Sequence, residues 1–516
     1  MTGPDVREEE LGGLIARRAA ASGDRTFMSF GAPGDGVSMT FAGFERRVAG
    51  FRGWLDAEGV RPGDRVALML KNSLAYPVAW IGTATAGAVA VPVNSRLGEV
   101  DARFVLEHSG AIALVTDDAT EAVARAASPP AVRSVFVART HDAMAGLESA
   151  PPAPPGTGAA GDLANIQYTS GTTGFPKGCE LSHRFWQRMG ATAVEVMGIT
   201  ERDTLLTSQP HSYIDPQWNV VAALRAGAQL VMLDGFHPGT FMRSAAEWAS
   251  TVFYCIGAMP TLLLKQPPAA WDREHRLERV FSSAIPVEHH AAIEERWGVP
   301  WSEAFGMTET GINLAVPARD HDRLVGSRSI GRVLPHCQAL AVDREDREVP
   351  TGTTGELVLR GLGFMDGYHD DPDATAAFFR NGWAHTGDLV RREADGTFTY
   401  VGRTKEMIRR GGENISPVEI ETTLSTHPDV LECAVAPVPD PDLGEEIKAY
   451  VVAREGGTPD ASAMAAFLAE RIAPFKVPRY WEIRAALPHT PSEKVAKALL
   501  EPDDRWRVRS VDLRPR

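Results

Sequence analysis

Apolar residues recur at helical spacing in two stretches near the start of the chain. Between residues 11 and 19 they lie on one face of a predicted helix, and a second amphipathic stretch covers residues 41–55. Each stretch has polar residues on its other face, which is typical of helices at the surface of a globular domain. The pattern therefore predicts helical structure over residues 10–60.

Short apolar runs then alternate with helical stretches. Residues 65–70 and 87–93 are typical of buried strands, and a helix is predicted between them at residues 76–86. A strand–helix–strand unit of this kind implies a parallel sheet that is covered on both faces. The alternation continues beyond the middle of the chain and predicts two doubly wound α/β lobes, with further strands at residues 113–116, 134–137, 166–168, 229–233, 252–256 and 280–282.

Past about residue 325 the pattern changes to short strands and turns. Strands expected at residues 339–342, 356–360 and 397–401 indicate a small β-rich subdomain. A Pro/Gly/Ala tract at residues 151–161 has no periodicity and is interpreted as a surface connection, not as a boundary between domains.

The last hundred residues predict a small, mobile α+β domain. A helix should begin at Ser416, with Pro417 in its first turn and Glu419 completing a capping box. Strands are expected at residues 431–436, 447–452 and 480–483. We therefore predict an α/β fold with an N-terminal domain at residues 1–402 and a C-terminal domain at residues 403–516.

Composition narrows the class of protein. The chain has 516 residues and a formal net charge of −14, which argues against a general binder of nucleic acids or anionic membranes. Its four cysteines form no closely spaced pair, and the acidic N-terminus lacks an apolar signal core. No run of about 18 apolar residues predicts a membrane span. These features predict a soluble, cytoplasmic protein, and they leave open whether it forms a homodimer.

Residues 168–178 form the most distinctive run in the sequence, Tyr-Thr-Ser-Gly-Thr-Thr-Gly-Phe-Pro-Lys-Gly. Glycines let backbone N–H groups surround an anion, while the hydroxyls add donors and Lys177 adds a positive charge. No Gly-Lys-Ser/Thr follows at the spacing of a P-loop. The alternative is an ordinary polar turn between strand and helix. The length and composition of the run favour a loop that binds a polyphosphate.

Two shorter motifs follow in order. Residues 303–309, Glu-Ala-Phe-Gly-Met-Thr-Glu, present a hydroxyl and a carboxylate together, and residues 386–388 are Thr-Gly-Asp. Taken alone, the first is compatible with a capping Thr and a solvated Glu, and the second with a plain turn. Their order after the glycine-rich run favours a functional interpretation of both motifs.

Together these motifs resemble those of the acyl- and aryl-adenylate-forming superfamily of AMP-binding enzymes, over roughly residues 30 to 500. Pro-His-x-x-Ile-Asp at residues 210–215 and Arg-Arg-Gly-Gly-Glu-Asn at residues 409–414 look most like the crotonobetaine/carnitine–CoA ligase branch. The resemblance implies ATP and Mg²⁺ as cofactors and coenzyme A as the probable second substrate. It assigns ATP or AMP binding to Thr169, Ser170, Gly171, Thr172, Thr173, Gly174, Lys177, Ser283, Ala284, Glu303, Ala304, Phe305, Gly306, Met307, Asp388 and Arg403.

The resemblance also assigns the catalytic and moving parts. Lys494 would be the catalytic lysine, acting with Thr308, with Glu309 as the Mg²⁺ ligand, and with His211 beside the acyl group. Lys405 would be the hinge of the small domain, and Gly411 and Gly412 would face coenzyme A. The final motif, Leu-Pro-His-Thr-Pro-Ser-Glu-Lys, departs from the superfamily because His489 replaces an Arg and Glu493 replaces a Gly.

The implied reaction activates an acid as its adenylate, with release of pyrophosphate, and then transfers the acyl group to coenzyme A. By position the acid pocket would contain His211, Tyr213, Asp215, Trp218 and Met307. This set predicts a small polar or aryl carboxylic acid, and a betaine-like acid is one option among these.

Two other functions stay open at this level. One is a stand-alone adenylating enzyme of secondary metabolism with a carrier-protein thiol, an amine, or nitrite for diazotisation of an aryl amine in place of coenzyme A. The other is a nucleotide-binding protein without turnover, which the carboxylate of Glu493 beside Lys494 would favour.

Overall fold

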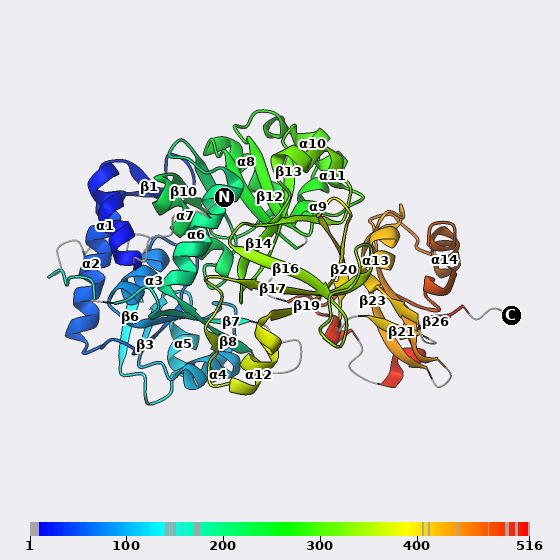
Figure 1. Cartoon of the computed structure of the whole chain (residues 1–516). Helices are drawn as coiled ribbons and strands as arrows, with labels where there is room; N and C mark the ends of the chain where they lie inside the picture. The colour runs from blue at the N-terminus through cyan, green and yellow to red at the C-terminus, as the bar shows by residue number, and fades with distance from the viewer. Residues whose placement is uncertain are drawn as a thin grey trace.

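The computed structural model has a large part that contains most of the sheets and a smaller part beside it, formed by the end of the chain (Figure 1). It describes residues 10–139, 144, 147, 151–156, 158–169, 176–257, 259–404, 407–410, 413–440, 443–472, 474–490, 495–500 and 504–513.

The first lobe is built on a seven-stranded sheet in the order β18-β8-β7-β4-β3-β5-β6. The five strands from β7 to β6 are parallel, whereas β8 and β18 are antiparallel to their neighbours. Its elements are β3 (Arg65–Met69), α3 (Ala75–Thr85), β4 (Val89–Pro92), α4 (Glu99–Ser109), β5 (Ala113–Asp117), α5 (Glu121–Ala127), β6 (Ser134–Ala138), β7 (Leu163–Thr169), β8 (Lys177–Ser182), β18 (Gly367–Tyr368) and α12 (Pro372–Phe378).

The second lobe contains a 13-stranded hydrogen-bonded path in the order β16-β17-β19-β20-β15-β14-β13-β12-β11-β9-β10-β1-β2. Its parallel centre runs from β13 to β1. The strands are β1 (Thr26–Phe30), β2 (Val37–Thr40), β9 (Thr204–Thr207), β10 (Gln229–Met232), β11 (Val252–Ile256), β12 (Arg279–Ser283), β13 (Trp301–Met307), β14 (Gly311–Ala315), β15 (Ser329–Val333), β16 (Cys337–Val342), β17 (Thr354–Gly361), β19 (Ala384–Arg392) and β20 (Phe398–Arg403).

The helices of this lobe include two that were predicted from the sequence and several that connect its strands. They are α1 (Leu11–Ser22), α2 (Phe41–Ala57), α6 (His183–Met197), α7 (Ile214–Ala226), α8 (Pro238–Glu247), α9 (Met259–Leu264), α10 (His290–Trp297) and α11 (His321–Leu324). The prediction of helix throughout residues 10–60 was wrong between α1 and α2. There β1 and β2 form an antiparallel pair at the end of the sheet, and β1 packs Phe27 against Phe41 of α2.

The β-rich subdomain is present, but its strands extend the sheet of the second lobe. β14 pairs with β13 on one side and with β15 on the other, and β15 pairs with β20. A continuous ladder therefore connects the parallel centre of the lobe to the strands that precede the C-terminal domain.

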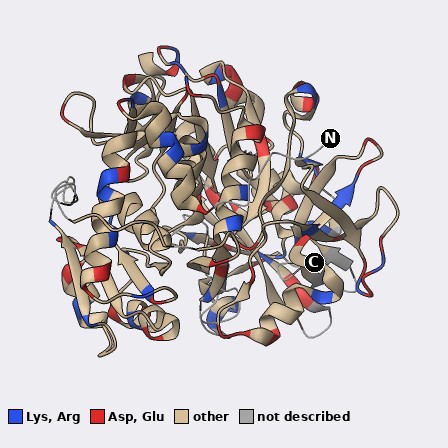
Figure 2. Ribbon diagram, turned by 60° about the vertical axis from the view of Figure 1, so that its left-hand side comes forward, with Lys and Arg blue, Asp and Glu red and all other residues tan. Residues whose placement is uncertain are grey.

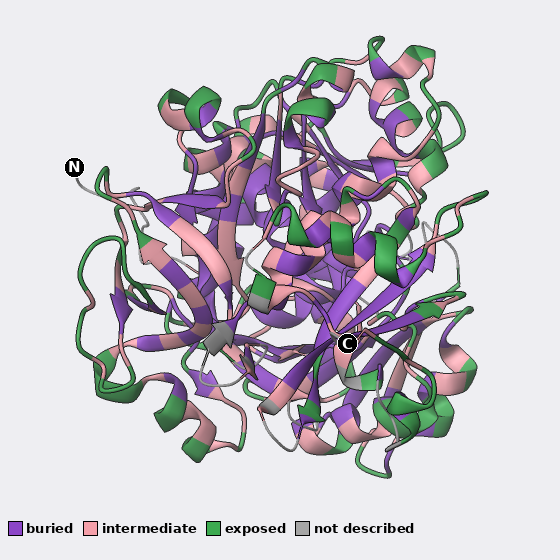
Figure 3. Cartoon of the chain, turned by 90° about the vertical axis from the view of Figure 1, so that its right-hand side faces the viewer, coloured by how far each residue is buried: buried purple, intermediate pink, exposed green. Residues whose placement is uncertain are grey.

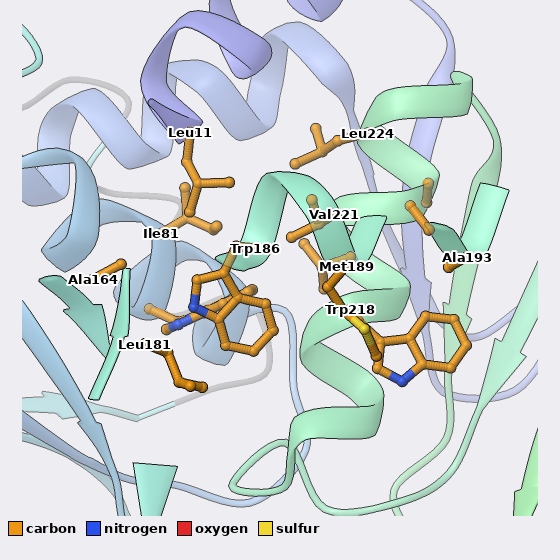
Figure 4. Close-up of a cluster of buried hydrophobic side chains, with 14 of the residues drawn as sticks. Leu11, Ile81, Ala164, Leu181, Trp186, Met189, Ala193, Trp218, Val221 and Leu224 are labelled. Carbon is orange, nitrogen blue, oxygen red and sulfur yellow. The ribbon is translucent and has the colours of Figure 1, made fainter. Parts of the chain in front are cut away.

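The core lies where α6 and α7 cross. Gly190 of α6 allows this close packing, because a Cβ at that position would lie 2.6 Å from Cγ1 of Val221. Trp186 and Trp218, both buried, extend from these helices into the surrounding apolar side chains (Figure 4). Strand interiors are buried while loops and outer helix faces are exposed (Figure 3). The two lobes thus share one large apolar core that fixes their relative position.

Both signs of charge occur throughout the molecule. Acidic and basic residues are interspersed along the helices and loops (Figure 2). Among the residues that the structure describes, no helix combines the length and the apolar character that a membrane span requires.

The C-terminal part has a six-stranded sheet covered by two helices. The path runs β22-β21-β24-β25-β26, and β23 pairs with β24. The elements are β21 (Ile408–Arg410), β22 (Glu413–Ile415), α13 (Pro417–Ser425), β23 (Val430–Asp440), β24 (Gly444–Ala453), α14 (Ala461–Ala469), β25 (Tyr480–Arg484) and β26 (Val511–Asp512).

Helix α13 begins where the sequence predicts, but the capping box is wrong. The Ser416 hydroxyl makes no capping hydrogen bond and instead donates to the Val401 carbonyl at 2.7 Å. The Glu419 carboxylate accepts from Nζ of Lys476 at 2.7 Å. Both side chains therefore bind partners outside the helix instead of its own N–H groups. Ser416 connects the helix to β20, and Glu419 connects it to the segment before β25.

A buried ion pair joins the strands of this domain to its last segment. Nζ of Lys448, which is fully buried, donates to Oε2 of Glu482 at 2.6 Å and to the Trp506 carbonyl at 3.3 Å. Removing one member of such a pair leaves an uncompensated charge in a place without water.

We expect Glu482→Leu to lower the free energy of unfolding by about 3–5 kcal/mol, because the Lys448 ammonium would lose its carboxylate. The double variant with Lys448→Met should recover most of that loss. Calorimetric unfolding of the full chain measures both. A double variant as unstable as the single one would show that the pair contributes by packing and not by charge.

Candidate active site

Several of the described residues that were singled out from the sequence lie at one edge of the second lobe. Ser283 ends β12, Met307 ends β13, and His211 follows the end of β9. These strands are parallel neighbours or near neighbours, so their carboxyl ends lie at the same edge. In open α/β sheets this edge is where ligands bind.

Two strands flank the glycine-rich run. β7 and β8 form an antiparallel pair that ends with Thr169 opposite Lys177, and Oγ1 of Thr169 donates to the Lys177 carbonyl at 3.5 Å. Of the predicted anion-binding residues, Ser170, Gly171, Thr172, Thr173 and Gly174 lie outside the described residues. The hairpin thus holds the two ends of the run at one point.

A tyrosine links the lysine of this hairpin to Glu309, the last residue of the motif at residues 303–309. Nζ of Lys177 lies 4.9 Å from the centre of the Tyr368 ring, and the Tyr368 hydroxyl donates to Oε1 of Glu309 at 2.9 Å. Lys177 also lies 3.9 Å from Oδ2 of Asp371. Glu309 is buried, and this burial raises the pKa of its carboxyl, while the Tyr368 hydrogen bond and the charge of Arg403 lower it.

Glu303 holds the turn that follows β12 at residues 283–285, the Glu303 turn. Its two carboxylate oxygens accept from the backbone N–H groups of Ala284 and Ile285, at 2.5 and 2.9 Å. Ala284 has a φ of 70°, a conformation that residues with a Cβ rarely adopt, and the carboxylate keeps it there. Burial raises the pKa of Glu303 to about 7.

The remaining residues of this motif lie on β13 and on the hairpin it forms with β14. The Ser283 hydroxyl donates to the Ala304 carbonyl at 2.7 Å, and Phe305 and Met307 are half-buried. Gly306 lies against β14 so closely that a Cβ would be 2.5 Å from the Gly311 carbonyl oxygen. Thr308 follows the end of the strand and is half-buried.

Asp388 and Arg403 face each other on adjacent strands. They are register partners on β19 and β20, and Nε of Arg403 donates to Oδ1 of Asp388 at 2.9 Å. The Tyr400 hydroxyl lies 3.5 Å from the same oxygen. Both charges act on the pKa of Glu309, so the pair lies close to that carboxyl.

His211 lies between the two lobes. It is buried, its ring centre is 5.3 Å from that of Tyr76 on α3, and its backbone N–H donates to Oδ1 of Asn72 at 2.9 Å. Burial lowers the pKa of the imidazole to about 3, so the ring is neutral. Tyr213, two residues on, accepts at its hydroxyl from Nδ2 of Asn94 at 3.1 Å.

A chain of contacts connects the predicted acid pocket to the Glu303 turn. Nε1 of Trp218 donates to Oδ1 of Asp215 at 3.2 Å, and the Trp218 ring packs edge-on against Tyr254 at 5.3 Å. The hydroxyls of Tyr254 and Ser283 are 2.5 Å apart. The acid-pocket residues and the nucleotide residues named from the sequence therefore belong to one contiguous region.

Further predicted residues belong to the C-terminal part. Lys405, Gly411, Gly412 and Lys494 lie outside the described residues, and so does Glu493. His489 does have a partner: its Nε2 is 2.6 Å from Oε1 of Glu432, and its backbone pairs with Val495. A hydrogen bond within the C-terminal domain thus involves the residue that replaces the superfamily's Arg.

Sequence reasoning missed Tyr368 and Asn72. Tyr368 belongs to Gly-Tyr-His-Asp-Asp-Pro at residues 367–372, and Asp371 caps α12 by accepting from the Ala374 N–H at 2.9 Å. The Asp-Pro pair predicts that helix start, but only the tertiary contact shows that the preceding Tyr reaches Glu309. Asn72 carries no signal of its own in the sequence.

The arrangement suits a negatively charged, hydroxyl-rich ligand. Lys177 and Arg403 supply positive charge, and Asp388 can accept two hydroxyl hydrogen bonds. Within the described residues, no cluster of three or more His, Cys, Asp or Glu side chains could hold a metal ion.

Comparisons with known proteins agree with this geometry. Residues 15–369 match the family described as AMP-binding enzyme, and residues 419–494 match the AMP-binding enzyme C-terminal domain. The chain is 34% identical to a sulfoacetate–CoA ligase of Cupriavidus necator, covering 97% of this chain and 98% of that one. It is also 34% identical to a crotonobetaine/carnitine–CoA ligase of Shigella dysenteriae, covering 86% and 89%.

A solved structure gives the same result for the fold. ATP-bound MatB from Rhodopseudomonas palustris superposes with a TM-score of 0.84 at 28% identity, covering 95% of this chain and 98% of that one. The predicted α/β fold, with its large N-terminal and small C-terminal α+β parts, is thereby confirmed. The chain belongs to the AMP-binding, adenylate-forming enzyme family and is of the acid–CoA ligase type.

Proposed function

We propose that this enzyme activates a small polar or aryl carboxylic acid with ATP and transfers the acyl group to coenzyme A. The first step forms an acyl-adenylate and pyrophosphate, and the second forms a thioester and AMP. The observation that carries the proposal is the grouping of Glu303, Glu309 and the Asp388–Arg403 pair at one edge of the sheet, each held by a different donor.

Each of these groups has a task in the first step. Asp388 would accept from the ribose hydroxyls, and Arg403 would hold it in place while also contacting ribose or phosphate. The adenine ring would lie against the Ser283–Ala284 turn, which Glu303 holds, and against residues 304–307. Lys177 and the hairpin would bind the phosphates that leave as pyrophosphate.

Adenylation overcomes the repulsion between two anions. The acid's carboxylate attacks the α-phosphorus in line with the departing pyrophosphate, so catalysis depends on positioning and on charge neutralisation. We assign that neutralisation to Lys494, whose ammonium is a compact point charge. Thr308 would donate to the α-phosphate, and the neutral His211 ring would contact the acyl group without adding charge.

Glu309 fits the role of the magnesium ligand. Mg²⁺ usually binds one or two carboxylates and takes its other ligands from water and substrate phosphates, so Glu309 could hold it together with the phosphates of ATP. When bound there, the ion would neutralise phosphate charge. The Tyr368 hydroxyl donates to Oε1 and so orients the Glu309 carboxylate.

The second step would use a different face of the C-terminal domain. We propose that residues 403–516 turn about Lys405 relative to residues 1–402, which removes Lys494 and brings Gly411 and Gly412 to the adenylate. The domain contact supports this, because Arg328 donates to Thr422 at 2.6 Å and Ser425 donates to Glu288 at 2.7 Å. Polar contacts of this kind release more readily than apolar ones.

ATP–pyrophosphate exchange tests the proposal directly. The panel includes short aliphatic, benzoic, cinnamic and carnitine-like acids, and nitrite. We expect exchange with at least one carboxylic acid, and the mass of a coenzyme A thioester once coenzyme A is added. Exchange with nitrite alone, or an adenylate that never transfers to coenzyme A, would contradict the proposed reaction.

Lys494→Ala should lower the rate of ATP–pyrophosphate exchange about 100-fold or more. AMP affinity and the unfolding temperature should stay close to those of the parent chain. Isothermal titration with AMP and calorimetry measure the two controls. Unchanged turnover would remove Lys494 from the catalytic step.

The titration of Glu303 gives a pH prediction. Its pKa is about 7, above the ordinary 4.5, so the folded chain keeps a proton that the unfolded chain has lost between these values. The stability that this proton contributes is present below pH 4.5 and is lost as the pH rises to 7, in total about 3 kcal/mol. The ionised form accepts from the two N–H groups more strongly than the protonated form does.

We therefore expect AMP affinity to rise as the pH increases through 7 in the parent chain and to be flat in Glu303→Gln. The unfolding temperature of the parent relative to the variant should fall over the same range. Calorimetry and AMP titration at several pH values measure both. Parallel curves for the two proteins would mean that Glu303 does not titrate in this range.

Tyr368→Phe removes the hydroxyl that lowers the pKa of the Glu309 carboxyl. We expect the pH at which the exchange rate falls on the acidic side to rise by about one unit. The Mg²⁺ concentration needed for half-maximal exchange should also increase. Tyr480→Phe is the matched control, because the Tyr480 hydroxyl is buried without a hydrogen-bond partner among the described residues. A Tyr368→Phe enzyme that is less active at all pH values, with no shift, would indicate a structural role only.

A further inference from the structure

Unpartnered polar atoms surround His211. Four buried side-chain atoms have no hydrogen-bond partner within the described part of the chain: Nε2 of His211, Oη of Tyr76, Oγ of Ser212 and Oε1 of Gln217. They belong together, since Tyr76 packs against the His211 ring and Nε2 of Gln217 donates to the His211 carbonyl at 2.9 Å. Buried polar groups in folded proteins are nearly always paired, so a cluster of four without partners indicates a place for a ligand.

The neighbours of His211 fix which of its nitrogens carries the proton. Nδ2 of Asn72 donates to the carbonyls of Gln209 and Leu233, both at 2.9 Å, so the Asn72 amide cannot be flipped. Its Oδ1 must then be the acceptor that faces Nδ1 of His211 at 3.4 Å. Because the buried ring is neutral, Nδ1 holds the single proton. Nε2 is therefore an acceptor that lacks a donor.

The same reasoning applies to Gln217. Its Nε2 donates to the His211 carbonyl, which fixes the orientation of the amide. Oε1 is then an acceptor, it is buried, and it too lacks a donor. The two hydroxyls of the cluster can act either way. The cluster thus contains two obligate acceptors and no obligate donor.

The cluster lies between the lobes and beside the nucleotide region. Asn72 and Tyr76 come from the first lobe, whereas residues 209–217 come from the second. Gln209, two residues before His211, donates to the Tyr254 carbonyl at 2.9 Å, and the Tyr254 hydroxyl contacts Ser283. Sites for small molecules occur preferentially at such boundaries between lobes.

We infer that the activated acid carries a hydrogen-bond donor, a hydroxyl or N–H group, which binds Nε2 of His211 and Oε1 of Gln217. This inference rests on the proposed adenylation and narrows its substrate class. A sulfonate offers only acceptors, and a quaternary ammonium has no N–H. The cluster thus disfavours sulfoacetate and crotonobetaine as substrates of this enzyme, whereas carnitine, the third acid in the names of these two relatives, carries a hydroxyl donor.

Matched pairs of acids test the inference by pyrophosphate exchange. The pairs are butyrate with its hydroxybutyrate isomers, and benzoate with its three hydroxy and three amino isomers, with sulfoacetate and crotonobetaine added. We expect at least one donor-bearing acid to exceed its parent by about tenfold or more in kcat/KM, since a site built to bind a donor rejects analogues that lack it.

Two outcomes would overturn the inference, and they differ. Exchange with donor-free acids that equals or exceeds that of their partners would leave adenylation intact and show that water satisfies the two acceptors. Silence with every acid, despite AMP binding, would contradict adenylation itself and the inference with it.

A pair of variants locates the preference. Gln217→Met removes the unpaired acceptor and should reduce the ratio between the preferred acid and its donor-free parent several-fold. Gln209→Met is the matched control, because Oε1 of Gln209 already accepts from the Thr207 hydroxyl at 3.0 Å. It should lower rates without changing that ratio. An unchanged ratio in Gln217→Met would remove Gln217 from substrate selection.

Discussion

The site depends on the donors that hold its carboxylates. Burial raises the pKa of Glu303 to about 7 and raises that of Glu309, while the hydrogen bonds to each carboxylate lower it. Here each has a different donor: two backbone N–H groups for Glu303, a phenol for Glu309, and a guanidinium for Asp388. These donors come from different strands and loops, so the ionisation of the site depends on the packing of the whole N-terminal part.

The long strand ladder of the second lobe connects the carboxylates of the site. Glu303 lies on β13 within the parallel centre, whereas Asp388 and Arg403 lie on β19 and β20 among antiparallel strands. β14 and β15 connect the two regions by backbone hydrogen bonds. The spacing between Glu303 and the Asp388–Arg403 pair is thus fixed by strand geometry and not by loops.

Much of this could be predicted from the sequence, and the failures have a common cause. The strand–helix alternation sufficed for the fold, and the motifs around Lys177, Glu309 and Asp388 named residues that the structure brings into one region, because both depend on local pattern. The capping box at Ser416 failed, since a carbonyl on β20 and a distant lysine are stronger partners than the helix's own N–H groups.

Tyr368 and Asn72 could not be found for the same reason. Neither belongs to a motif with obvious chemistry, and each matters through a partner that is far away in the chain. The Asn72 amide bridges two lobes, with Gln209 and His211 on the other side, and Tyr368 reaches Glu309 from the far edge of the first lobe. Hydrogen-bonding capacity can be read from a sequence, but the identity of a distant partner cannot.

The short strand β18 has a consequence for how the protein folds. β8 would be an exposed edge strand if Gly367 and Tyr368 did not pair with Glu180 and Cys179, nearly 190 residues earlier in the chain. Contacts of such long sequence separation form late, because the loop between them must close first. During synthesis, therefore, the glycine-rich hairpin leaves the ribosome well before the strand that covers it. Until β18 is made, the nascent chain has an open sheet edge beside the glycine-rich hairpin, and this edge is exposed to misassembly.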